Sequence, residues 1–130
     1  MSMTTPSLGE VTGATVLLDH ERLDVYRVAV ELDAEVVRIC RRVGRGHGWL
    51  RAQAQDASGS VVLNLAEGLG RAGADRAQHL RIARGSALEV DAALMLLWHR
   101  GACAAADRAR VRELVVREVS MLTRMLRASA

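Results

Sequence analysis

The chain has 130 residues, half of them apolar and a quarter charged, with a formal net charge of +3, which suits one soluble globular domain with a real core. Two cysteines exclude a disulfide scaffold, and the longest apolar run, residues 92–98, is far too short to span a bilayer. The N-terminal residues lack the basic start and apolar run of a signal peptide, so we expect a reduced, cytoplasmic protein.

Residues 1–19 are rich in Thr, Ser and Gly and show no helical period. We therefore expect a flexible leader ahead of one domain that spans residues 20–128. The first strong helical period runs from about Leu23 to Val43, with Asp33 expected at its rim or paired. Its inward positions alternate at spacings of four and three, as in a helix with a broad buried face: Val25, Ala29, Leu32, Val36, Ile39 and Val43.

The glycine-rich residues 44–48 break this helix, and a second helix is predicted from about residue 50 to residue 69. Glycines at 68, 70 and 73 then end it. The face of this helix is unusual, because small and polar residues share it at helical spacing. A surface of this kind favours close approach by another helix: Ala57, Ser60, Val61, Asn64 and Gly68.

Asp75 is the predicted N-cap of a third helix, which runs to about Arg100. Gly85 lies inside that helix, and we expect a close approach to the second helix there, because an interior glycine is otherwise unfavourable. Gly101 ends the third helix, and Asp107 can cap a fourth that runs to about residue 128. Four amphipathic helices with short connections predict an all-α, up-and-down antiparallel four-helix bundle.

The second and third helices carry polar residues that can bond across their interface. Glu67 can pair with Arg71 one turn on or with Arg84 of the third helix, and a satisfied network of this kind fixes the register of packed helices. We therefore interpret the set as a structural network inside one subunit or between subunits, with a ligand site as the alternative. Its members are Ser60, Asn64, Glu67, Arg71, Arg84, Ser86 and Glu89.

Two of these segments resemble the signatures of a known family. Residues 60–71, SVVLNLAEGLGR, are similar to the S-I-x-x-N-I-A-E-G-x-x-R motif of the 23S rRNA intervening-sequence proteins, and residues 82–89, IARGSALE, match that family's I-A-R-G-S-x-x-E. Residues 23–26 resemble its opening segment, so the similarity covers residues from about 20 to 126. The chain departs from the family at His79, which is usually aromatic, and at residues 55–56, which are usually basic.

The resemblance implies a four-helix bundle that assembles as a ring, usually a homopentamer. It also implies kinship with the accessory variability determinant of diversity-generating retroelements, a relative that binds nucleic acid and a partner reverse transcriptase. The intervening-sequence proteins themselves have no settled biochemical activity.

No set of residues in the sequence predicts catalysis, a cofactor or a metal. Residues 68–73 match G-x-G-x-x-G, but a helix precedes them instead of a strand, so they indicate a helix stop. No Glu is followed by His three residues later, as a di-metal bundle would require. His99 and Cys103 have no second pair of zinc ligands, and the serines and histidines form no recognisable triad. We therefore expect no enzyme.

The remaining candidates are arginines, which suit phosphate groups because of their planar fork. In a ring, repeated patches of arginine would bind RNA or another nucleic acid by multivalency, mainly through the backbone. The open alternatives are a solubilising face and a protein scaffold that recruits a partner enzyme such as a reverse transcriptase. The candidate nucleic-acid-binding residues are Arg41, Arg42, Arg45, Arg108, Arg110, Arg112, Arg117, Arg124 and Arg127.

Overall fold

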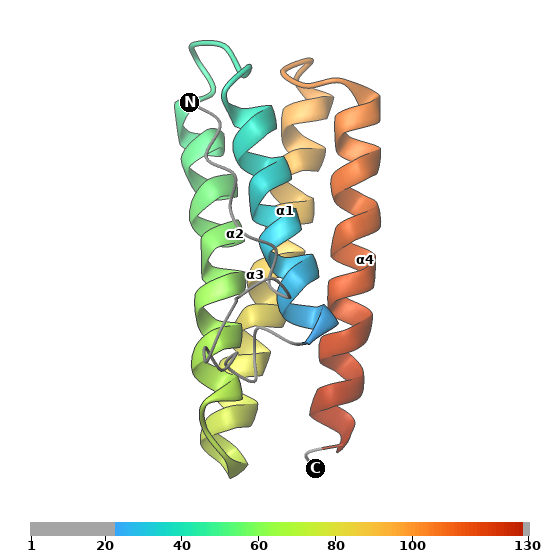
Figure 1. Cartoon of the computed structure of the whole chain (residues 1–130). Helices are drawn as coiled ribbons and strands as arrows, with labels where there is room; N and C mark the ends of the chain where they lie inside the picture. Colours follow the sequence, from blue (N-terminus) through green and yellow to red (C-terminus); the bar gives the residue numbers. More distant parts are fainter. Residues whose placement is uncertain (1–22, 129–130) are drawn as a thin grey trace, which may run out of the picture.

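The computed structural model describes residues 23–128, so the predicted leader at residues 1–19 lies outside the described part of the chain. Four helices account for most of the described residues: α1 (Asp24–Cys40), α2 (Gly48–Leu69), α3 (Gly73–His99) and α4 (Ala105–Ala128). They run alternately up and down and pack side by side (Figure 1). The predicted all-α four-helix bundle is confirmed, with helix ends shifted by a few residues.

Each helix contacts its two neighbours around the bundle, so that α1 packs against α2 and α4, and α3 packs against the same two helices. The core between them is built mainly from Leu, Val and Ala, with Ile39 and Cys40, and no aromatic residue or methionine is among the buried side chains of the described residues. All six inward positions predicted for the first helix are buried, from Val25 to Val43. The inner positions of α3 that recur at helical spacing from Leu80 to Leu97 are buried as well. No helix in residues 23–128 is long and apolar enough to cross a membrane.

The end of α3 follows the predicted glycine stop. Gly101 has a positive φ of 73°, its N–H donates to the Trp98 carbonyl, and the N–H of Ala102 donates to the Leu97 carbonyl at 2.7 Å. These two bonds form a Schellman motif, in which a left-handed residue after the helix satisfies the last carbonyl groups.

The starts of α3 and α4 differ from the predictions. Helix α3 begins at Gly73, its N-cap position is Ala72, and Asp75 lies in the first turn. Arg71 forms an ion pair of 2.7 Å with the Asp75 carboxylate, so the Asp75 side chain is not free to cap the helix. Asp107 likewise lies in the first turn of α4 and is bound by Arg38 of α1 and by Arg42, which lies just after the end of α1. Neither aspartate is the predicted cap.

The close approach predicted at Gly85 occurs at Gly68 instead. A Cβ atom added at Gly68 would lie 3.1 Å from His79 Cβ and 3.2 Å from a methyl carbon of Leu80, so α2 and α3 meet there with no room for a side chain. A Cβ added at Gly85 would have no atom within 4 Å. The prediction at Gly85 is therefore wrong. A glycine inside a helix is about 1 kcal/mol less favourable than Ala, and the packing of the described residues does not explain why one stands at position 85.

Candidate nucleic-acid interface

The small polar residues of α2 bond across the interface with α3. Ser60 Oγ lies 2.8 Å from Ser86 Oγ. Asn64 donates through Nδ2 to Ser60 Oγ at 3.0 Å, and its Oδ1 lies 3.1 Å from Nδ1 of His79. His79, which replaces an aromatic residue of the family pattern, is thus a bonded histidine of the helix interface. The structure brings these four residues together as a structural network between two helices of one chain.

The charged members of the predicted network lie apart from it. Arg71 donates to Glu67 at 3.1 Å and to Asp75 at 2.7 Å, and these bonds, the one to Asp75 foremost, raise the pKa of Arg71. Glu67 therefore pairs one turn on, the first of its two predicted alternatives. Arg84 instead faces α4, where its Nε donates to Thr123 Oγ1 at 2.9 Å.

Glu89 also lies outside that network. It is exposed on α3, and no hydrogen bond or ion pair joins it to another described residue. The predicted set thus divides into three parts: a bonded group across α2 and α3, an ion pair between Glu67 of α2 and Arg71 just after that helix, and two residues of α3 that bond elsewhere or not at all.

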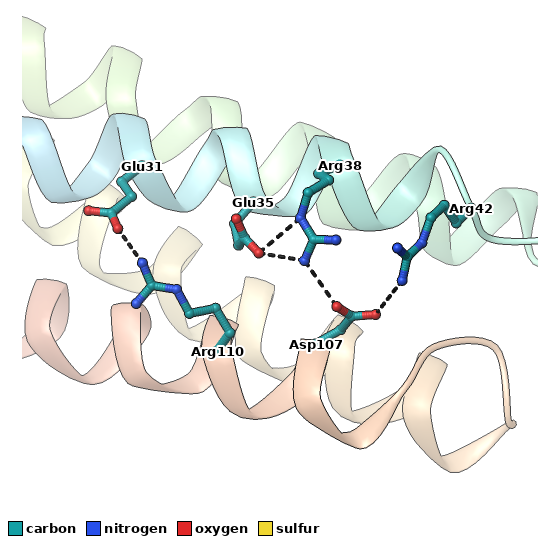
Figure 2. A network of polar contacts seen from close by, with 6 residues as sticks. All are labelled: Glu31, Glu35, Arg38, Arg42, Asp107 and Arg110. Atoms are coloured by element: carbon teal, nitrogen blue, oxygen red, sulfur yellow. Dashed lines mark hydrogen bonds and ion pairs between the residues drawn. The ribbon is translucent and has the colours of Figure 1, made fainter. Parts of the chain in front are cut away.

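Helices α1 and α4 are joined by ion pairs that the sequence did not predict (Figure 2). Asp107, only 8% exposed, accepts from Arg38 at 3.0 Å and from Arg42 at 3.2 Å. Arg38 also binds Glu35, and its bonds to Glu35 and Asp107 raise the pKa of this guanidinium. Two turns away, Glu31 of α1 pairs with Arg110 of α4. The charges on this side of the bundle are therefore largely neutralised within the chain.

This pairing removes several arginines from the candidate set. Arg42 and Arg110 are bound to carboxylates across the α1–α4 interface, and Arg112 binds Asp91 of α3 at 3.1 Å. Arg108 lies with its guanidinium carbon 5.2 Å from the centre of the Trp98 ring, an arrangement that gives a favourable cation–π contact. These four side chains already have partners, so they are weaker candidates for contact with a phosphate group.

Arg117, Arg124 and Arg127 remain without a carboxylate partner among the described residues. They belong to a larger surface formed by the N-terminal half of α3 and the C-terminal half of α4, which lie side by side in the lower part of Figure 1. Three shallow hollows open around it: one between α3 and α4, one where Arg76 of α3 lies beside α4 and the start of α1, and one between α4 and the start of α1. We call this surface the arginine face; its members are Arg76, Arg81, Arg84, Arg117, Arg124 and Arg127.

The arginine face carries little compensating negative charge. Asp24, which is paired with Arg27, is the only acidic residue that lines these three hollows within residues 23–128. Arg41 and Arg45, the last two candidates, lie at the opposite end of the bundle, beside the connection between α1 and α2, and are exposed. The structure thus separates the unpaired candidates into two distant groups, and the arginine face is the larger.

A buried carboxylate is the feature that sequence reasoning missed. Glu118 of α4 is fully buried, and neither carboxylate oxygen has a hydrogen-bond partner in the described structure. Burial raises the pKa of Glu118 to about 8. The signal was present in the sequence, because Glu118 lies four residues from both Leu114 and Leu122, which are also fully buried.

The cysteines and acidic residues form no second site. Cys40 is buried on the inner side of α1, and burial raises the pKa of its thiol and of the Cys103 thiol. Among residues 23–128, no group of three or more His, Cys, Asp or Glu side chains is placed to hold a metal ion.

Comparison with known proteins agrees with the sequence signatures. The family model described as 23S rRNA-intervening sequence protein matches residues 21–124, which is most of the chain and includes all four helices but the last turn of α4. No curated protein matches the chain. The extent of the family match, together with the four-helix fold, shows that this chain belongs to the 23S rRNA-intervening sequence protein family.

Proposed function

We propose that this protein is a non-enzymatic, self-associating four-helix bundle that binds structured RNA through arginines repeated around a ring, most simply a homopentamer. The observation that carries the proposal is the arginine face, where six guanidinium groups gather on two adjacent helices without carboxylate partners among the described residues. The choice of RNA as the nucleic acid rests on the family description, which refers to an rRNA intervening sequence.

The energetics favour a repeated surface over a single one. An exposed arginine gains little from one phosphate contact in water, and salt weakens it further. Several contacts made at once by linked copies add through a high effective concentration. The described chain has three aromatic residues, Tyr26, Trp49 and Trp98, so stacking platforms for single strands are scarce. Binding should therefore be directed to the backbone and strongly dependent on salt.

Self-association is supported by apolar side chains on the outer side of α2 and α3. Leu63 is 68% exposed and Ile82 is 40% exposed. Along their helices these residues lie between the two bonded pairs, Ser60 with Ser86 and Asn64 with His79. A second copy that covered Leu63 and Ile82 would bury apolar area, which is favourable. The same exposed residues favour the second candidate function, a scaffold that recruits a partner protein.

The test is RNA binding by the double variant Arg117→Glu/Arg124→Glu. We expect the dependence of log Kd on log salt to fall by about 2, because each arginine that contacts phosphate contributes about one to the slope. The matched control is Arg41→Glu/Arg45→Glu, which makes the same change of charge at the opposite end. Equal losses in the two variants would mean that net charge alone drives binding, and unchanged binding in the first would refute this site.

Light scattering after size exclusion, with and without nuclease, tests the assembly. A mass of five chains with nuclease-sensitive absorbance at low salt supports the proposal. A pentamer free of nucleic acid would favour the protein scaffold, and a monomer would contradict both functions, since each needs repeated surfaces.

A further inference from the structure

Gly85 has no role in the internal packing of α3, although a glycine in the middle of a helix is unfavourable. It lies on the outer side of the helix, two residues from the fully buried Ala83 and Ala87. An added Cβ would meet nothing within 4 Å. A glycine in such a place leaves the helix backbone open to something that approaches from outside.

The space over Gly85 is a hollow between α3 and α4 of about 550 Å³. Arg81 and Arg84 of α3 line it together with Arg127 of α4, so three arginine side chains border the bare backbone of Gly85. We call this the Gly85 hollow. The lining contains no carboxylate, which is the arrangement expected for an anion with two or more oxygen atoms to share.

Arg84 is held in place by its neighbour across the hollow. Its Nε donates to Thr123 Oγ1 at 2.9 Å, which uses one N–H of the guanidinium and leaves the terminal nitrogens for an incoming group. Leu126 also lines the hollow and gives it an apolar wall beside the charged groups. The hollow therefore combines a fixed guanidinium, two further positive charges and an apolar surface.

We propose that the Gly85 hollow binds one nucleotide of the RNA, with its phosphate among Arg81, Arg84 and Arg127 and its sugar or base against Leu126 and the exposed backbone at Gly85. This inference rests on the proposed function and adds the contact that orients the RNA on each subunit. A phosphate on a flat surface would need no glycine, whereas a sugar or base needs the space that a Cβ and longer side chain at position 85 would fill.

The test fills the hollow without disturbing the fold. Gly85→Gln adds a neutral, helix-favouring side chain where no internal atom is close. We expect binding of a fluorescently labelled RNA hairpin to weaken by about tenfold or more. The matched control is Gly59→Gln, because Gly59 is also helical and has no atom within 4 Å of an added Cβ; it should bind as the unchanged chain does.

A second variant tests the positioning of Arg84. Thr123→Val keeps the shape of the side chain and removes the hydroxyl that accepts from Arg84 Nε. We expect a smaller loss of affinity, about threefold, and rescue by Thr123→Ser, which restores the hydroxyl. A purely structural role for Thr123 would change the unfolding midpoint and leave RNA affinity unchanged.

The outcomes separate the hollow from the proposed function. If the unchanged protein binds no RNA at low salt, the proposed function fails, and the hollow loses its ligand with it. If the unchanged protein binds and Gly85→Gln binds equally well, the hollow is refuted while the proposed function stands. If Gly85→Gln changes the mass of the assembly, the hollow is occupied by a second copy of the chain and the inference is overturned.

Discussion

Glu118 gives the sharpest prediction of stability, because its carboxyl group is buried without a partner in the described structure. We consider Glu118→Met, which keeps an unbranched side chain of similar length and removes the ionisable group. Met is a good helix former and fits irregular apolar surroundings. The substitution should therefore stabilise the bundle, and by an amount that depends on pH.

The sign follows from the two pKa values. In the unfolded chain the carboxyl group ionises near its usual 4.5, whereas burial raises the pKa in the folded protein to about 8. Between these values the folded state holds a proton that the unfolded state has lost, so the free energy of unfolding falls as pH rises. The slope reaches about 1.4 kcal/mol per pH unit, and between pH 4.5 and about pH 7 the loss amounts to roughly 3 kcal/mol.

The assay is urea denaturation of both proteins at a series of pH values and at one fixed protein concentration, because association would make stability depend on concentration. The difference between Glu118→Met and the unchanged chain cancels every other titrating group. That difference should grow by roughly 3 kcal/mol from about pH 4.5 to about pH 7. A constant difference across this range would show that Glu118 ionises as an exposed carboxyl group does, and would refute the reasoning.

Two further substitutions test the packing and the ion pairs. Gly68→Ala should destabilise the fold by about 1–3 kcal/mol, because the new methyl group would lie between 3.1 and 3.3 Å from a backbone carbonyl oxygen and two side chains. The control Gly59→Ala, where no atom is close, should stabilise the fold by up to about 1 kcal/mol. Equal shifts of the urea midpoint in the two variants would contradict the close approach at Gly68. Asp107→Asn should cost about 1–3 kcal/mol, since it removes the charge that Arg38 and Arg42 share, against about 0.5 kcal/mol or less for Asp24→Asn on the surface. Similar small losses from both aspartates, measured by the same denaturation, would mean that burial adds nothing to the Asp107 contacts.

The helices and their buried stripes could be predicted from the sequence because they depend on local spacing. Residues such as Leu32 and Val90 repeat with the helical period, and a helix with one apolar stripe has one way to bury it. The contact between α2 and α3 was also predictable in kind, because Ser60 and Asn64 stand where a larger residue would hold the helices apart. The spacing did not indicate that Asn64 would bond to His79.

The errors arise where two roles share one local pattern. An aspartate near the start of a helix can cap it or pair with a basic residue, and Asp107 pairs because the crossing of α1 and α4 brings arginines to it. This crossing is a tertiary property that no local window contains. Gly85 was placed at a helix interface, although its position two residues from Ala83 and Ala87 already turns it away from the core. For Glu118, the charge of the residue obscured a spacing that placed it inside.

The polar contacts of α1 also determine the handedness with which the four helices are arranged. Asp33 lies on one flank of the buried stripe of α1 and meets Ser58 of α2 at 2.6 Å, whereas Arg38 lies on the other flank and meets Asp107 of α4 at 3.0 Å. Four helices joined by short connections can be arranged with either hand, and the mirror arrangement would exchange the places of α2 and α4 beside α1. Asp33 would then lose its bond to Ser58, and Arg38 would lose the Asp107 carboxylate. An apolar stripe of Ala, Val and Leu cannot distinguish the two hands, so these flanking residues supply the discrimination.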